Sequence, residues 1–433
     1  MKKPVTKTIR VDTLARVEGE AALEIKFKGG QVSAVKLKIF EPPRLFEALL
    51  RGRHCSEAID ITSRICGICP VAYQMSATHA MERALGIKVD PAIRLLRRLF
   101  YCGEWIESHT LHVYMLHAPD FLGYQDAIAM ARDHRELVEK ALRLKKIGNR
   151  IVSSLGGREI HPVSAAIGGF FKTFSRSELR ELEADLEWAL AASLDTVKLV
   201  SGFDFPRFEQ DYEFVALRHP DEYPFNEGHL VSNRGLDIDA SEYEHYFSEI
   251  HVEHSNALHS VIRGRGNYLV GPMARFNLNF DQLPDVAKQA ALRAGIAPPV
   301  TNPFRSIVVR AVEIVFACAE ALRIIRAYSP PPRPFVEWTN CEGTGEAITE
   351  APRGILYQRY RIDKAGLILS AQIVPPTSQN QGRIEDDLRA FAAGLANAPT
   401  EEATWKCEQA VRNYDPCISC ATHCLKVSIT HLT

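Results

Sequence analysis

The sequence predicts an α+β fold that is mainly helical and forms one large domain. Period-two alternation of apolar residues predicts small β-sheets near both ends of the chain, in residues 8–41 and 355–374. Helical periodicity, bounded by proline and glycine, covers most of the residues between them. Two C-x-x-C pairs lie near opposite ends of the sequence. They predict that the two ends of the domain meet at one metal site.

Local signals place the first elements in order. Residues 8–41 predict a β-hairpin that turns at Gly29-Gly30, and residues 56–63 predict a short helix. Pro70 is typical of a first helical turn, and it opens a helix that runs to Leu85 before Gly86. Pro91 opens a long helical region through Asn149, with a break expected at residues 118–120. Further helices are expected at 176–200, 280–295, 304–327, 384–396 and 400–412, and short strands and helices at 201–275.

Composition excludes several classes of protein. The 433 residues carry a formal net charge of −1, which does not favour binding to nucleic acid or to an anionic membrane. The most apolar stretch, residues 306–325, is interrupted by charged residues, so we expect a buried helix and no membrane span. No apolar run follows the basic N-terminus, so no signal peptide is expected, and we predict a cytoplasmic protein.

The two cysteine pairs are the strongest chemical signal. Cys66 and Cys69 form the first pair, and Cys417 and Cys420 form the second, some 350 residues later. Such a separation is unlike a local zinc knuckle and predicts one site with four thiolates. The donor set alone leaves zinc, iron–sulfur and nickel open. Six of the ten cysteines fall outside these pairs and are expected to be plain thiols: Cys55, Cys102, Cys318, Cys341, Cys407 and Cys424.

With their flanks, the two pairs resemble the signature motifs of the large subunit of nickel–iron hydrogenases. These motifs stand here as R-I-C-G-I-C-P and D-P-C-I-S-C-A-T-H. The resemblance extends over nearly the whole chain, through residues 16–20, 47–53, 156–169, 271–275, 350–354 and 372–377. Within that family, residues 101–109 and the proline after Cys69 are similar to the cytoplasmic bidirectional branch, and most of all to NAD(P)-coupled hydrogenases and sulfhydrogenases.

The resemblance implies reversible heterolytic cleavage of H₂ to protons and electrons at a nickel–iron centre. All four paired cysteines would bind nickel, and Cys69 and Cys420 would also bridge to an iron that carries one carbonyl and two cyanides. Cys420 would be a first base, and Glu18 the next proton carrier. Arg353 would lie over the open side of the metals.

Further roles carry over by motif. Asp415 would pair with Arg353, and Thr377, next to Pro376, would donate to a cyanide nitrogen. Glu47, His423 and the main-chain carbonyl of Ile373 would bind Mg²⁺.

Two positions depart from the uptake-type pattern. Tyr73 stands where those enzymes have a histidine, and Ser108 where they have an aspartate near the arginine.

Family precursors are cut after the terminal histidine, so residues 424–433 are expected to be a C-terminal propeptide if this is the precursor form. Within the single domain of residues 1–433, we expect an N-terminal β region (1–42), a mainly helical body (43–350) and a C-terminal β/α region (351–423).

The chain has no further cysteine cluster and no dinucleotide motif, so it must pass electrons to partners. The resemblance implies an iron–sulfur small subunit and then diaphorase-type flavin and ferredoxin-like subunits that reach NAD(P), together a heterotetramer. It also implies a maturation protease and nickel-insertion chaperones. The alternatives are an F420-coupled or heterodisulfide-linked hydrogenase, a metal-free respiratory-complex homologue, and a structural four-cysteine zinc protein.

Overall fold

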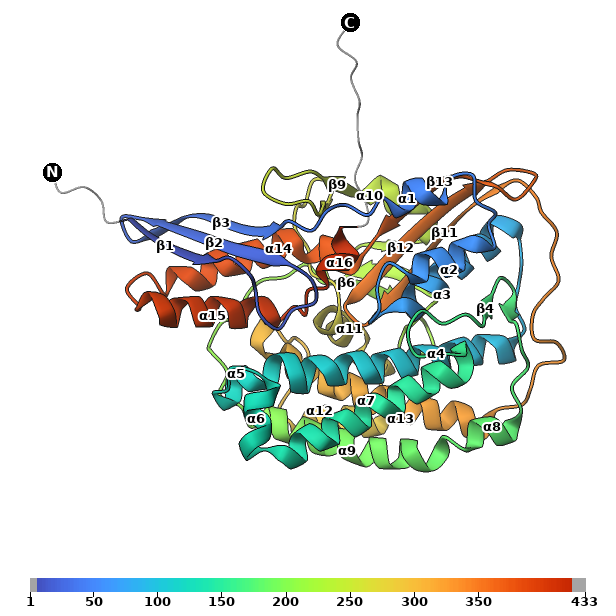
Figure 1. The fold of residues 1–433 in the computed structure, drawn as a ribbon, viewed down its shortest axis with the longest axis horizontal. Helices are drawn as coiled ribbons and strands as arrows, with labels where there is room; N and C mark the ends of the chain where they lie inside the picture. Colours follow the sequence, from blue (N-terminus) through green and yellow to red (C-terminus); the bar gives the residue numbers. More distant parts are fainter. Residues whose placement is uncertain (1–5, 423–433) are drawn as a thin grey trace, which may run out of the picture.

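A row of long helices forms the lower half of the molecule in the view of Figure 1, and small sheets lie above it. The computed structural model describes residues 6–422. The row contains α4 (Pro91–Thr110), α7 (Arg135–Gly156), α9 (Glu183–Ser201) and α13 (Ser306–Ala327), with shorter helices at its ends: α5 (Ala118–Leu122), α6 (Ala127–Asp133), α8 (Arg176–Arg180) and α12 (Asp285–Arg293).

Helix α13 forms the centre of this row, between α4 and α9. Apolar residues surround it on every side, as expected for a helix that is buried all round. Its two buried glutamates are each paired with an arginine, Glu313 with Arg275 and Glu320 with Arg98. Pairing is what allows charged groups to remain inside a core.

The N-terminal sheet is antiparallel, in the order β1 (Thr6–Val11), β2 (Ala21–Lys28) and β3 (Gln31–Ile39). In β2 buried residues alternate with more exposed ones, so one face of the sheet is apolar. Two C-terminal helices, α14 (Pro376–Ala393) and α15 (Thr400–Arg412), lie beside this sheet (Figure 1).

A second antiparallel sheet carries the C-terminal half of the site, in the order β11 (Gly343–Ala351), β12 (Gly354–Ile362) and β13 (Ile368–Val374). Helices α1 (Phe46–Leu50), α2 (Glu57–Ser63) and α3 (Pro70–Leu85) lie close to it (Figure 1). Helix α3 packs directly on β11, where a β-carbon at Gly345 would lie 2.0 Å from the carbonyl oxygen of Ala80. Only glycine permits this approach of helix to strand.

Shorter elements complete the described part of the chain. The strands are β4 (Ala165–Ala166), β5 (Gly169–Phe170), β6 (Val215–Arg218), β7 (His229–Ser232), β8 (Asp237–Ile238), β9 (Phe247–Ile250) and β10 (His259–Ile262). The helices are α10 (Tyr243–Tyr246), α11 (Pro272–Asn279), α16 (Ile418–Ala421), the π-helix η1 (Leu111–His117) and the 3₁₀ turns η2 (Ala240–Glu242), η3 (Phe280–Gln282) and η4 (Pro303–Arg305).

The predicted α+β class, mainly helical with small sheets near both ends, is confirmed. The helix predicted from Pro70 to Leu85 has those bounds in the structure. The break predicted at residues 118–120 is wrong: the chain stays helical from α4 through η1 and α5, and it first leaves the helix at Gly123. Pro119 lies in the first turn of α5, directly after the π-helix η1, where the helical hydrogen-bond pattern changes. Among residues 6–422, we find no helix with the length and hydrophobicity needed to cross a membrane.

Candidate metal centre

The four paired cysteines come together at one buried point. Cys66 and Cys69 precede α3, whereas Cys417 and Cys420 lie at and within α16, which occupies the middle of the molecule in Figure 1. Their sulfur atoms all lie within 4.8 Å of one another. Sγ of Cys66 lies 3.5 Å from that of Cys417, and Sγ of Cys69 lies 3.6 Å from that of Cys420. Each contact therefore joins the two ends of the chain.

The chemistry of this donor set fits a bound metal. All four residues are at most 3% exposed. Burial raises the pKa values of Cys417 and Cys420, whereas the hydrogen bond from Cys417 lowers the pKa of Cys66. Without a cation, the thiols must share protons because four thiolates cannot be buried together. A soft metal ion replaces those protons and is the expected occupant.

Backbone amides support the first pair. The N–H groups of Ile68 and Cys69 point at Sγ of Cys66, at 3.3 and 3.4 Å. Cys69 occupies the N-cap of α3 but provides no side-chain cap. The free amides of Val71 and Ala72 instead donate to the buried carboxylate of Glu104 on α4, at 2.7 and 3.2 Å. Glu104 thus fixes the helix end that carries Cys69.

Glu18 contacts the second pair. Its Oε2 lies 3.0 Å from Sγ of Cys417 and accepts the main-chain N–H of Ser419 at 3.1 Å. The main chain of Glu18 also pairs with that of Cys417 as an isolated parallel bridge. Gly19 permits this contact: its φ is 85°, and a β-carbon there would lie 2.7 Å from Cβ of Ile418.

Arg353 and Asp415 form a buried ion pair beside the sulfurs. Nε of Arg353 donates to the Asp415 carbonyl at 2.8 Å, and Nη2 donates to Oδ1 at 3.1 Å. Nη1 lies 3.4 Å from the hydroxyl of Ser108. Burial disfavours the charge on Arg353, but Asp415 and the neighbouring cysteines raise its pKa above the usual value. A fixed cation therefore lies next to the thiol cluster.

Arg275 supports the segment that carries Arg353. It donates to the main-chain carbonyls of Ala351 and Pro352, at 2.9 and 2.8 Å, and its charge is balanced by Glu313 and Glu350. These hydrogen bonds fix the turn that precedes Arg353.

Thr377 lies in the first turn of α14 beside Pro376, and both residues are buried. Its hydroxyl oxygen accepts the main-chain N–H of Cys417 at 3.0 Å. The hydroxyl proton can therefore point to another acceptor. This contact brings the residue predicted to face the iron ligands directly against the second cysteine pair.

Of the predicted magnesium ligands, the structure brings Glu47 and Ile373 together. Oε1 of Glu47 accepts the main-chain N–H of Ile373 at 2.7 Å. His423 lies outside the described residues, as do Cys424 and the rest of the predicted propeptide, residues 424–433.

Tyr73 lies one turn into α3. Its hydroxyl is buried without a hydrogen-bond partner among the described residues. Burial raises its pKa, and the four cysteines raise it further. A neutral phenol therefore stands where uptake-type enzymes have a histidine.

Three supporting residues were missed in the sequence: Arg44, Glu104 and Arg275. Nη2 of Arg44 donates to the carbonyl of Ile65 at 2.6 Å and also to that of Ser419, so it joins the two cysteine segments. The sequence does give a signal for a residue such as Glu104. A helix that begins at Cys69-Pro70 has no side-chain cap, so its free N–H groups need a hydrogen-bond acceptor from elsewhere in the chain. Arg275 ends one of the motifs that carry the resemblance (271–275), but that motif does not show which groups it binds, and nothing in the local sequence points to Arg44.

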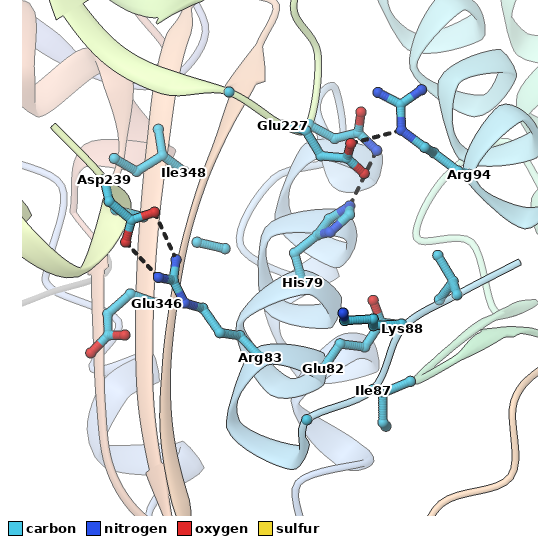
Figure 2. A pocket seen from close by; sticks show the side chains of 16 residues that line it. His79, Glu82, Arg83, Ile87, Lys88, Arg94, Glu227, Asp239, Glu346 and Ile348 are labelled. Atoms are coloured by element: carbon cyan, nitrogen blue, oxygen red, sulfur yellow. Dashed lines mark hydrogen bonds and ion pairs between the residues drawn. The ribbon is translucent and has the colours of Figure 1, made fainter. Parts of the chain in front are cut away.

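A separate cavity of about 580 Å³ lies along the C-terminal half of α3 (Figure 2). His79 lines it, ten residues or about 15 Å of helix from Cys69. Its arginines are already paired, Arg83 with Asp239 at 2.5 Å and Arg94 with Glu227 at 2.7 Å. None of the cysteines in residues 6–422 lines this cavity, so it is distinct from the metal centre.

The remaining described cysteines stand apart from the cluster. Cys55, Cys102, Cys318 and Cys407 are buried thiols, and Cys341 is exposed. Burial raises the pKa of each of the four buried ones. They are therefore protonated and unreactive at neutral pH.

Comparison with known proteins gives a consistent result. Residues 44–142 and 326–423 match the family described as nickel-dependent hydrogenase. The chain is 34% identical to the Pyrococcus furiosus sulfhydrogenase 1 subunit alpha, over 97% of this chain and 98% of that protein. It is 27% identical to the beta subunit of the NAD-reducing hydrogenase HoxS of Cupriavidus necator, over 97% and 96% of the two chains. A crystal structure of an NAD⁺-reducing [NiFe]-hydrogenase in the H₂-reduced state superposes with a TM-score of 0.88 at 26% identity, covering 96% of this chain and 99% of the other.

Proposed function

The chain belongs to the nickel-dependent hydrogenase family as a catalytic large subunit, and from this premise we propose how its residues serve the reaction and which electron acceptor it supplies. The observation that carries the proposal is the cluster of four buried thiols, with Glu18 and Arg353 against it. When bound there, nickel and iron supply the redox-active Lewis acid at which H₂ is split.

Cys66, Cys69, Cys417 and Cys420 would hold the nickel, and Cys69 and Cys420 would also hold the iron. Cys420 accepts the first proton at its sulfur. Glu18 would take the proton onward by way of Cys417, because Sγ of Cys417 lies 2.8 Å from Sγ of Cys420 and 3.0 Å from Oε2 of Glu18, within reach for a proton transfer. The Ser419 amide keeps this oxygen in place.

Arg353 provides a fixed positive charge beside the sulfurs. Its two bonds to Asp415 hold the guanidinium in one orientation. Asp415 adopts φ of 51°, which an aspartate tolerates better than most residues, and this turn lets both its carbonyl and its side chain face Arg353. Asp415 is therefore a positioning residue.

The iron would carry two cyanides and one carbonyl, and Pro376, Thr377 and Arg353 would line the place of these ligands. The Thr377 hydroxyl accepts from the Cys417 amide and so has its own proton available for a cyanide nitrogen. Mg²⁺ would bind at Glu47, with the carbonyl of Ile373 and the imidazole of His423 completing the protein ligands. The contact between Glu47 and Ile373 supports this assignment.

Electrons leave through an iron–sulfur small subunit and then through flavin and ferredoxin-like subunits to NAD(P), in a cytoplasmic heterotetramer. The relatives are named as subunits, and two of the matched proteins are named for the reduction of NAD⁺, which supports this path. Coupling to F420 or to a heterodisulfide is the alternative. Nickel-insertion chaperones and a maturation protease would complete the centre.

Infrared spectroscopy of the anaerobically purified enzyme tests the centre. We expect one carbonyl and two cyanide bands that shift under H₂. Absence of these bands in protein from its native host, with zinc bound instead, would contradict the assignment. Zinc is the alternative occupant of this site because it also binds four thiolates.

The assembled enzyme under H₂ tests the acceptor. Reduction of NAD⁺ or NADP⁺ at a rate comparable with that of an artificial dye supports the proposed path. Reduction of F420 alone would favour the alternative, while leaving the assignment of the metal centre intact.

A further inference from the structure

A second cluster of metal-ligating side chains lies away from the cysteines. His254, His259 and Glu385 each present one ligand atom, and these three atoms lie within 4.8 Å of one another. His254 lies in the loop after β9, His259 begins β10, and Glu385 lies on α14. The mechanism proposed above uses none of them.

His259 is the unexplained member of this cluster. Its side chain is buried, with the residue 4% exposed, and Nε2 has no hydrogen-bond partner among residues 6–422. A buried polar atom without a partner costs about 1–3 kcal/mol, so this nitrogen points to a bound group. Burial, and then the nearby His254, lower the pKa of His259 to about 4. Its imidazole is therefore neutral at pH 7 and offers a lone pair.

The carboxylate of Glu385 is held by His254 within the cluster and by β3 from outside it. Oε1 of Glu385 lies 2.7 Å from Nε2 of His254 and accepts the main-chain N–H of Leu37 on β3 at 2.8 Å. The neighbouring Asp386 accepts the side-chain amide of Asn267 at 2.7 Å and adds negative charge close to His259. Metal ligands are commonly oriented by such outer hydrogen bonds.

We propose that His254, His259 and Glu385 bind a divalent zinc ion, with water as the fourth ligand. Two imidazoles and one carboxylate form a donor set that suits Zn²⁺. Tetrahedral zinc with bonds of about 2.0–2.1 Å places its ligand atoms roughly 3.3 Å apart. Binding therefore needs the cluster to close by small side-chain rotations.

The site would fasten three elements together. Glu385 lies on α14 two turns after Thr377, whose hydroxyl accepts the Cys417 amide. The ion would tie the segment from β9 to β10 to this helix, and the Leu37 amide already ties β3 to it. Zinc would then stabilise the helix that supports the second cysteine pair without taking part in the chemistry there.

The experiment measures zinc per chain by mass spectrometry in the assembled enzyme, after equilibration with micromolar Zn²⁺ and dialysis. We expect one zinc in the wild type and in the control His251→Ala, an exposed histidine of the same loop. His259→Ala and Glu385→Gln should lose at least nine-tenths of it, while nickel content stays unchanged in all variants. If either variant fails to fold, the more exposed His254→Ala replaces it.

Zinc-edge X-ray absorption supplies an independent result. Nitrogen and oxygen neighbours without sulfur support the proposal, whereas sulfur neighbours would place the zinc at the cysteines and overturn it. The proposal would also be overturned if the wild type retained no zinc, or if His259→Ala and Glu385→Gln retained as much zinc as the wild type.

Discussion

Glu18 combines two tasks in one carboxylate oxygen. Oε2 accepts the Ser419 amide and lies against Sγ of Cys417, so the same atom fixes the loop and meets the thiol. A glutamine in this place keeps the acceptor oxygen but cannot carry a proton. The two tasks can therefore be separated by one substitution.

We predict that Glu18→Gln lowers H₂ oxidation by about 100-fold or more, the usual contribution of a general base. Nickel content and the apparent Tm should stay at wild-type values, because the Ser419 contact remains. The matched control is Glu20→Gln, an exposed glutamate two residues along, which should leave the rate unchanged. Turnover by Glu18→Gln within twofold of the wild type would exclude Glu18 from the proton path.

Glu107 on α4 gives a pH dependence of stability. Burial raises its pKa to about 7, although Lys145, 3.1 Å away, opposes the shift. Between its ordinary value near 4.5 and about 7, the folded state holds a proton that the unfolded state has released. Stability from this group therefore falls as the pH rises through that window, by on the order of 3 kcal/mol.

Glu107→Gln should remove this loss. Relative to the wild type, its apparent Tm should rise by several degrees on going from pH 5 to pH 8. Glu136→Gln, an exposed glutamate on α7, should show no such trend. Thermal scans across the pH range check this, and parallel curves for the wild type and Glu107→Gln would show that Glu107 ionises normally.

At the scale of elements, α4 and α7 touch through two glycines. A β-carbon at Gly148 would lie 2.6 Å from the Gly103 carbonyl oxygen and 2.7 Å from the Glu107 amide. Backbone atoms cannot move aside as a flexible side chain can, so an added methyl group forces the helices apart.

We predict that Gly148→Ala destabilises the protein by about 1–3 kcal/mol, despite the better helix propensity of alanine. Gly103→Ala should cost less, since its nearest contacts would be 3.0 Å. Leu142→Ala, at a 55% exposed position of α7, is the control and should change the apparent Tm little. A wild-type Tm for Gly148→Ala would mean that the helices have room to separate.

Elements whose ends are marked by proline or glycine could be predicted from the sequence. Elements whose bounds depend on tertiary packing could not. Pro70 and Gly86 give α3 its bounds, and Gly29-Gly30 gives the turn between β2 and β3. Helix α14 starts at Pro376, eight residues before the predicted 384, because its first turns are buried polar residues without a helical apolar pattern. The strand β11 was missed for a similar reason: glycines at Gly343 and Gly345, needed for contact with α3, weaken its strand signal.

At the metal centre too, local sequence patterns predicted some residues, and tertiary contacts alone revealed the roles of others. Motifs gave the residues that face the sulfurs, Glu18 and Arg353 among them, because each stands in a short recognisable pattern. The groups that hold them, Arg44, Glu104 and Arg275, act on main-chain atoms of distant segments. Such contacts depend on the tertiary structure, so the stretches 101–109 and 271–275, which contain Glu104 and Arg275, do not show which atoms these residues bind.

At the scale of the whole molecule, the site exists only when the two ends of the chain close on each other. Arg44 contributes most directly to that closure. Its guanidinium donates to the carbonyls of Ile65 and Ser419, one beside each cysteine pair, and its main-chain N–H donates to Thr422 at 2.8 Å. Hydrogen bonds from a charged group are worth about 1.5–3 kcal/mol each.

We therefore predict that Arg44→Met leaves the fold intact but loosens the metal centre. Methionine keeps an unbranched apolar side chain, but it removes both side-chain hydrogen bonds and the guanidinium whose Cζ lies 5.3 Å from the centre of the Phe46 ring. Loss of outer hydrogen bonds typically weakens metal binding by about 10–100-fold, so nickel should leave at least tenfold faster during dialysis against a chelator. Arg51→Met, an exposed arginine at the end of α1, is the control and should release nickel at the wild-type rate. Equal release from Arg44→Met and the wild type would mean that the cysteines and their metals close the chain without this arginine.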